Sequence, residues 1–116
     1  MLTKQDVVNA KSDSVATCDA QLVNAATLKN GASPADSNRI DVDMTSIRAK
    51  RTAIEVQDYI GALDDPALQA ALNKIQSATN DMKTTAQNMT TVADFITNVA
   101  TFVNGAGRVV STLQGV

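Results

Sequence analysis

Apolar residues recur at every seventh position in the second half of the chain, and this repeat constrains the fold more than any other feature. The residues after Pro66 that keep this spacing are Leu68, Ile75, Met82, Met89, Ile96 and Val103. A second series, at the intervening four-residue step, is Leu72, Thr79, Ala86, Ala93 and Ala100. Residues seven apart return to the same side of an α-helix, so the two series predict helices that each bury one face.

Two proline-containing segments separate further helices. Gly31 suits the position just after a helix, and Ser33 with Pro34 suits the cap and first residue of the next one. Asp65 and Pro66 repeat the cap-and-proline arrangement later in the chain. These signals predict helices joined by short turns. Helices joined by short turns are antiparallel neighbours.

Residues 88–91 decide between three and four helices. Thr91 reads as an N-cap with acidic Asp94 three residues later. An unbroken helix after Pro66 would reach roughly 57 Å, whereas the two helices before it span roughly 40–45 Å. We predict an all-α, antiparallel up-down bundle over 1–116, with helices at about 4–30, 34–63, 66–88 and 91–113. A three-helix bundle with one long C-terminal helix is the alternative.

The first two helices carry weaker apolar stripes. In the first, the stripe is Val8, Val15 and Leu22, with Lys11, Cys18 and Ala25 at the three-residue step. In the second, it is Ile40, Met44, Ile47 and Ile54, extended by Ala35 and Ala62 and interrupted by Arg51. Apolar residues make up 44% of the chain, but only three residues are aromatic. The core must therefore be mainly aliphatic, which favours closely packed helices.

The closing stretch, residues 90–116, is rich in valine and poor in charge. Its residues at helical spacing form one broad apolar face: Val92, Phe95, Ile96, Val99, Phe102, Val103, Ala106, Val109, Val110 and Leu113. Polar residues occupy the opposite side, so we expect no transmembrane span. Three interpretations stay open: a core helix, a helix that also meets a partner or a second copy, and a helix that inserts into lipid. Gly105 and Gly107 predict that the helix ends near Asn104, or else that another helix approaches closely there.

Charge and residue types exclude several classes of function. The net charge is −2, so electrostatics give no support to nucleic-acid binding. The chain has no His, a single Glu and a single Cys. We therefore expect no metal, no cofactor and no enzymatic activity. Cys18 is expected to be a small buried or half-buried residue, with an intermolecular disulfide as the alternative.

Protein contact is the function that remains. Arg48, Lys50 and Arg51 form the one basic cluster, in which Arg51 can pair with Glu55 four residues on. The candidate contact residues are Arg48, Arg51, Tyr59, Phe95, Phe102 and Val109. We predict a non-enzymatic bundle, an accessory, adaptor or effector-like protein, that binds a protein partner or itself. The alternatives are a lipid-interacting bundle that uses the C-terminal helix and a carrier of a small ligand between Ala-rich helices.

The layout of the chain also resembles a group of known proteins. It is rich in Ala, Thr and Asn, has short turns and begins without a hydrophobic leader. In these respects it resembles small all-helical proteins of Gram-negative bacteria that have no assigned activity, some of which are met as immunogenic antigens. The start of the chain predicts a cytoplasmic protein, or one exported by a leaderless route.

Overall fold

The computed structural model describes residues 3–57 and 65–115, and these residues form four α-helices and no strand. The helices are α1 (Lys4–Lys29), α2 (Pro34–Glu55), α3 (Asp65–Gln87) and α4 (Val92–Gln114). They pack into an elongated bundle of 51 × 22 × 17 Å. The prediction of an all-α four-helix bundle is confirmed.

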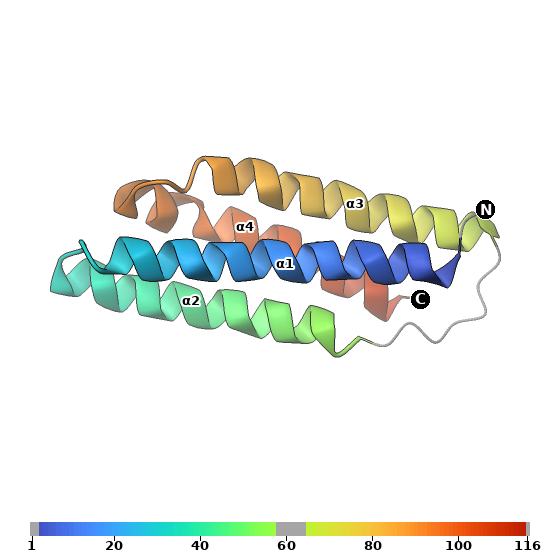
Figure 1. Ribbon diagram of the computed structural model, residues 1–116, viewed down its shortest axis with the longest axis horizontal. Helices are drawn as coiled ribbons and strands as arrows, with labels where there is room; N and C mark the ends of the chain where they lie inside the picture. The colour runs from blue at the N-terminus through green and yellow to red at the C-terminus, as the bar shows by residue number, and fades with distance from the viewer. Residues whose placement is uncertain (1–2, 58–64, 116) are drawn as a thin grey trace.

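Successive helices alternate in direction, so α1 begins and α4 ends at the same end of the bundle (Figure 1). Helix α1 packs against α2, α3 and α4, and α4 packs against all three other helices. In the described part of the chain the backbones of α2 and α3 do not come close to each other. The expectation that every turn joins neighbouring helices is therefore wrong for α2 and α3, which lie at opposite corners. The two helices with three neighbours, α1 and α4, lie between them.

Two helix starts follow their local sequence signals. The Ser33 hydroxyl accepts a hydrogen bond from the Asp36 backbone N–H (3.2 Å), with Pro34 as the first helical residue. The Thr91 hydroxyl accepts one from the Asp94 N–H (3.1 Å). Each cap satisfies a backbone donor that has no partner inside its helix. The predicted break between α3 and α4 is confirmed.

The end of α2 corrects the prediction that this helix reaches residue 63. The helix ends at Glu55, one residue after Ile54, the last residue that it buries in the core. Beyond it Val56 is 64% exposed. The side-chain ammonium of Lys11 donates a hydrogen bond to the Gln57 carbonyl and so satisfies an acceptor just past the helix end. Ala62 lies outside the described residues.

The core is aliphatic apart from two phenylalanines. In α2 the predicted stripe is confirmed, because Ile40, Met44, Ile47 and Ile54 are all buried, although Ala35 is exposed. The largest side chains with less than 2% exposure are Phe95, Phe102, Ile40, Ile47, Ile54, Ile75, Met82 and Met89. They come from α2, α3, α4 and the turn before α4, so no single pair of helices makes the core.

The buried face of α1 differs from the predicted stripe. Val8 is 39% exposed, and Val15 and Leu22 are only partly buried. The buried residues are Val7, Ala10, Ser14, Thr17, Cys18, Gln21 and Ala25. Of these, Cys18 and Ala25 belong to the predicted stripe. Polar members of this set find partners: Ser14 and Thr79 share a hydrogen bond between α1 and α3. Because α1 has three neighbours, it buries a wide face of small and polar residues rather than a narrow aliphatic seam.

Helix α4 continues through its two glycines to Gln114, so the prediction of an end near Asn104 is wrong. A Cβ atom on Gly105 would lie 2.8 Å from Cγ of Met82 on α3. The alternative interpretation, close approach of another helix, explains this glycine. Gly107 has more room, with Lys50 as its nearest neighbour at 3.8 Å from the corresponding Cβ position.

Candidate interaction surfaces

The hydrophobic candidate residues of α4 lie in the core. Phe95, Phe102 and Val109 each have no exposed surface. A partner or a lipid surface could reach them only if α4 left the bundle. Tyr59 lies outside the described residues. Of the candidate contact residues, only the two arginines of α2 therefore have described side chains that reach the surface of the folded bundle.

Arg51 is engaged within the chain. Its Nε atom lies 2.6 Å from Oδ1 of Asp19 on α1, and its guanidinium also pairs with Glu55. The pairing with Glu55 confirms the prediction from their four-residue spacing. The hydrogen bond that Arg51 donates to Asp19 raises the pKa of Arg51, which keeps the guanidinium charged. Arg51 therefore ties α2 to α1, and its charge is already neutralised.

Arg48 is exposed and, among the residues that the structure describes, makes no ion pair. Asp41, seven residues before Arg48 on the same helix, binds Lys29 across the α1–α2 turn at 2.7 Å. Arg48 thus carries the one uncompensated charge of the arginines in the basic cluster. It lies on the side of α2 that faces solvent next to α1.

A second stripe runs along α2 on the side away from the core. Its members are Val42, Thr45, Ala49, Thr52 and Val56, and all five are exposed. They are spaced three and four residues apart, which places them on one line along the helix. Val42 and Val56 are 63% and 64% exposed, the largest exposures among the large hydrophobic residues after that of Val23 on α1. Helix α2 therefore has an uncharged outer face that nothing in the described structure covers.

This outer stripe could have been found in the sequence. Val42, Ala49 and Val56 repeat every seven residues, as regularly as the buried set that begins with Ile40 and Ile47. The isoleucine series is the more hydrophobic of the two, so sequence reasoning identified it and missed the series of Val42, Ala49 and Val56. A helix with apolar residues on two opposite sides is expected where the helix packs against its own bundle and against something else.

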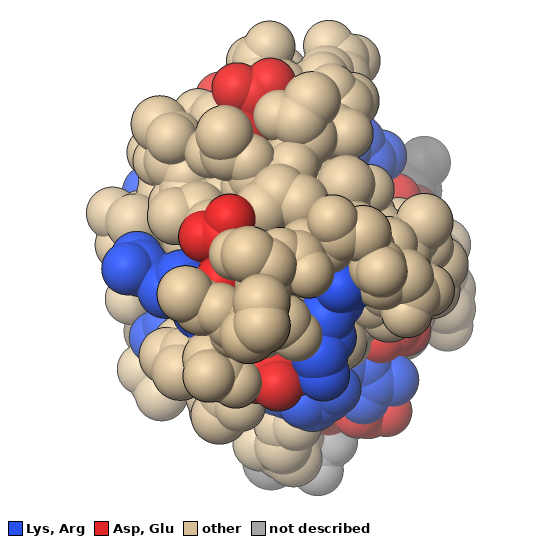
Figure 2. Space-filling model, turned by 90° about the vertical axis from the view of Figure 1, so that its left-hand side faces the viewer, with Lys and Arg blue, Asp and Glu red and all other residues tan. Residues whose placement is uncertain are grey.

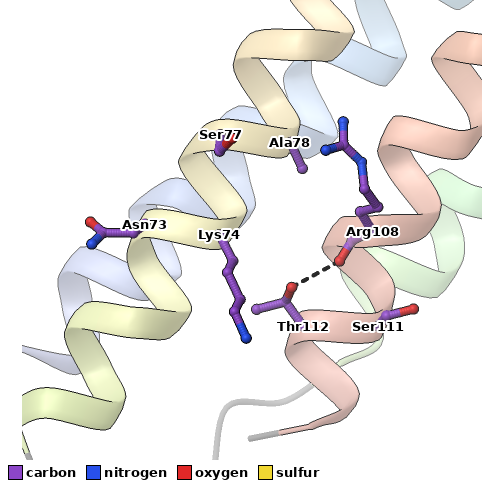
Figure 3. Close-up of a pocket in the computed structure, with 7 residues that line it drawn as sticks. All are labelled: Asn73, Lys74, Ser77, Ala78, Arg108, Ser111 and Thr112. Carbon is purple, nitrogen blue, oxygen red and sulfur yellow. Dashed lines mark hydrogen bonds between the residues drawn. The ribbon is translucent and has the colours of Figure 1, made fainter.

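A groove between α3 and α4 forms a hollow on the described surface, with a volume of about 430 Å³. Figure 3 shows Lys74 reaching from α3 toward Thr112, and Arg108 rising from α4 beside Ala78. The remaining lining residues, Asn73, Ser77 and Ser111, are polar and small. Such a groove forms because short side chains on both helices leave space between them. Sequence reasoning missed it, since neither helix alone shows which faces meet.

Metal clusters, membrane-spanning helices and surface charge would each indicate a different function of the described residues. It holds no group of three or more His, Cys, Asp or Glu side chains that could bind a metal ion. No helix within residues 3–57 and 65–115 is long and apolar enough to cross a bilayer. At the end with the α1–α2 and α3–α4 turns, acidic and basic side chains are interspersed within a larger uncharged area (Figure 2). That end shows no broad patch of one sign.

Comparison with known proteins adds no family. No protein-family model matches the chain, and no curated protein sequence or solved structure is significantly similar to it. The function must therefore be argued from the surfaces themselves.

Cys18 is fully buried, as expected for a small core residue. Burial raises the pKa of its thiol from 9.0 to about 11, and the Asp19 carboxylate adds to the rise. At pH 8 the native thiolate fraction is about a hundredfold below that of the unfolded chain, so the native thiol should react at least that much more slowly with a disulfide reagent. The check is the rate of thiol modification with and without denaturant. Similar rates would contradict the burial.

Asp43 is a buried carboxylate in which one of the two oxygen atoms has no hydrogen-bond donor among the described residues. Its Oδ1 lies 3.3 Å from Nε of Arg39, but no described residue donates to Oδ2. Replacing it by Asn should leave stability unchanged or raise it by about 1 kcal/mol, because a poorly paired buried charge disappears. Asp41→Asn, which removes an exposed pair, is the matched control. A loss of more than about 2 kcal/mol for Asp43→Asn in urea unfolding would show that the Arg39 pair is essential.

Proposed function

We propose that this chain is a non-enzymatic helical bundle that acts through protein–protein contact, as an accessory or adaptor protein. The outer stripe of α2 (Val42, Thr45, Ala49, Thr52 and Val56) carries this proposal, because it is an exposed, uncharged face at the spacing that helix pairing uses. An amphipathic helix of a partner would cover it and remove its apolar area from water.

Charge indicates what that partner carries. Along the α1 side of the stripe lie Asp41, Arg48 and Glu55, one every seven residues. Asp41 and Glu55 already bind Lys29 and Arg51 in the same chain, whereas Arg48 has no acidic partner in the described structure. A partner helix with an acidic residue opposite Arg48 would supply one. We infer a partner helix with small or β-branched residues along its contact face and a carboxylate at its edge.

The same charges disfavour a second copy of the chain as the partner. Because the stripe is nearly symmetric about Ala49, an antiparallel copy would place Arg48 against Arg48, and Asp41 against Glu55. A parallel copy would place Arg48 against Ala53, whose side chain carries no charge to pair with. Neither arrangement gains an ion pair, and the first brings like charges together. Binding to a different protein is therefore favoured over self-association.

Site-specific photo-cross-linking in cells that produce the protein tests the proposal. A photoreactive residue at Ala49 should give a defined cross-linked product, and one at exposed Gln76 on α3 should not. Arg48→Glu should lower the Ala49 product at least about fivefold, while Lys83→Glu, the same charge change on α3, leaves it intact. Equal products at Ala49 and Gln76, or equal losses with both charge changes, would refute the proposed surface.

Light scattering separates the two kinds of partner. The purified chain is expected to remain monomeric at high micromolar concentration, since self-pairing through α2 gains no ion pair. A dimer that dissociates on Val42→Glu would show that the same face is used for self-association instead. Thermal unfolding of each variant shows that the bundle remains intact, because all the substituted side chains are exposed.

A further inference from the structure

The groove between α3 and α4 extends beyond its largest part. A second hollow of about 270 Å³ adjoins it and shares Lys74, Ser111 and Thr112. Its further walls are Ala67, Ala70, Ala71 and Gly115, which bring no charge. Lys74 thus lies where the two hollows meet, and its side chain borders both of them. A volume of about 430 Å³ for the larger part falls within the range of small-molecule sites.

The polar groups around the larger hollow are biased toward donating hydrogen bonds. Lys74 and Arg108 offer N–H groups and cannot accept. Asn73 accepts a hydrogen bond from Gln69 through its Oδ1 (2.7 Å) and points away from α4 (Figure 3), so it adds no acceptor between the two helices. Ser77 and Ser111 add hydroxyls that donate or accept. No carboxylate lines either hollow.

The charge of the groove is only partly compensated. Arg108 Nη2 binds the Asp81 carboxylate at 2.7 Å, one turn beyond the groove along α3. This pair holds the guanidinium at the rim with one edge engaged. Lys74 makes no ion pair within the described residues. In a chain whose net charge is −2, the groove is therefore a local positive site.

We propose that this groove binds a small molecule through an oxyanion, a phosphate or carboxylate group that Lys74 binds, while Arg108 lies across the groove and extends in another direction (Figure 3). An oxyanion has several acceptor lone pairs and negative charge, which matches a site of donors with surplus positive charge. The alanine-lined extension accommodates the uncharged remainder of the ligand. Among the described residues, this site is lined only by residues of α3 and α4 and by Gly115, so it shares no residue with the outer stripe of α2 proposed above for protein contact.

The test is an NMR titration of the full chain with inorganic phosphate at constant ionic strength, with chloride replaced in step. Amide shifts should saturate and should concentrate around residues 73–78 and 108–112. Lys74→Ala should weaken binding about tenfold, as expected for loss of one charge-assisted hydrogen bond. Lys83→Ala is the matched control: it removes an exposed lysine of α3 that binds Asp13 outside the groove, and it should leave binding unchanged.

Each outcome is decisive. Shifts that grow linearly without saturation, or that fall equally in both lysine variants, would reflect general charge attraction and overturn the proposal. Sedimentation with vesicles that contain anionic phospholipid separates two sources of the oxyanion. If vesicle binding depends on Lys74 while inorganic phosphate gives saturable shifts, both share the site. Vesicle binding that depends on Lys74 without any phosphate response would assign the oxyanion to a lipid headgroup and overturn the small-molecule proposal.

Discussion

A chain that ends after Asn88 is expected to lose the cooperative unfolding transition of the full protein. Helix α4 supplies eight buried residues: Phe95, Val99, Phe102, Gly105, Ala106, Val109, Val110 and Leu113. Like α1, it packs against both α2 and α3, whose backbones do not come close to each other in the described structure. Without it, the apolar faces of both helices would meet water, and burial of those faces is what stabilises helices of this length.

Circular dichroism during heating measures this effect. The truncated chain should show a broad, shallow loss of helix signal instead of a sigmoidal transition. A chain that lacks only residues 115–116 is the control, and it should melt like the full protein because α4 ends at Gln114. A truncated chain with an unchanged cooperative transition would mean that α4 is dispensable for folding. Its apolar face would then be a candidate for binding a partner or lipid.

Phe102→Ala is expected to reduce the free energy of unfolding by about 3–5 kcal/mol. The Phe102 ring is fully buried in the core cluster, with no exposed surface. Its removal loses the transfer free energy of the ring and leaves a cavity that rigid helices fill only in part. The free energy of unfolding of a small domain is about 5–15 kcal/mol, so this one substitution removes a large part of it.

Urea unfolding of the variant and of Thr101→Ala makes the comparison. Thr101 is the exposed neighbour of Phe102 on the same helix, and its replacement should change stability by less than about 0.5 kcal/mol. A small effect at Phe102 would show that the ring is not packed in solution. The sequence alone allowed a contact role for this residue, and a core role predicts the opposite result for stability.

Local signals in the sequence determined where two of the helices begin. Ser33 and Thr91 each cap a helix through a hydrogen bond to a backbone N–H three residues away. Such bonds close within one turn, so they depend little on the rest of the fold. The apolar face of α4 was equally visible, because a broad apolar stripe opposite a polar one is the pattern of a helix that buries one side. The number of helices and the all-α class followed from these signals.

Packing decided which faces are buried. In α1 the sequence favoured Val8, yet the structure buries Val7 and Ser14, because a helix with three neighbours buries a wider face than one stripe. Gly105 was ambiguous until α3 was seen to approach it. Periodicity describes one helix, and it contains no information on how many helices will surround it.

The candidate surfaces depended most on tertiary structure. Arg48 and Arg51 are three residues apart on α2, but among the described residues only Arg51 meets a carboxylate of another helix, Asp19. Lys74 and Arg108 are 34 positions apart and line one groove only because α3 and α4 pair. Caps and amphipathic faces arise from interactions within a few residues, so the sequence by itself determined them. Charge pairing and hollows arise between helices, so only the packed bundle decided which side chains remain available for binding.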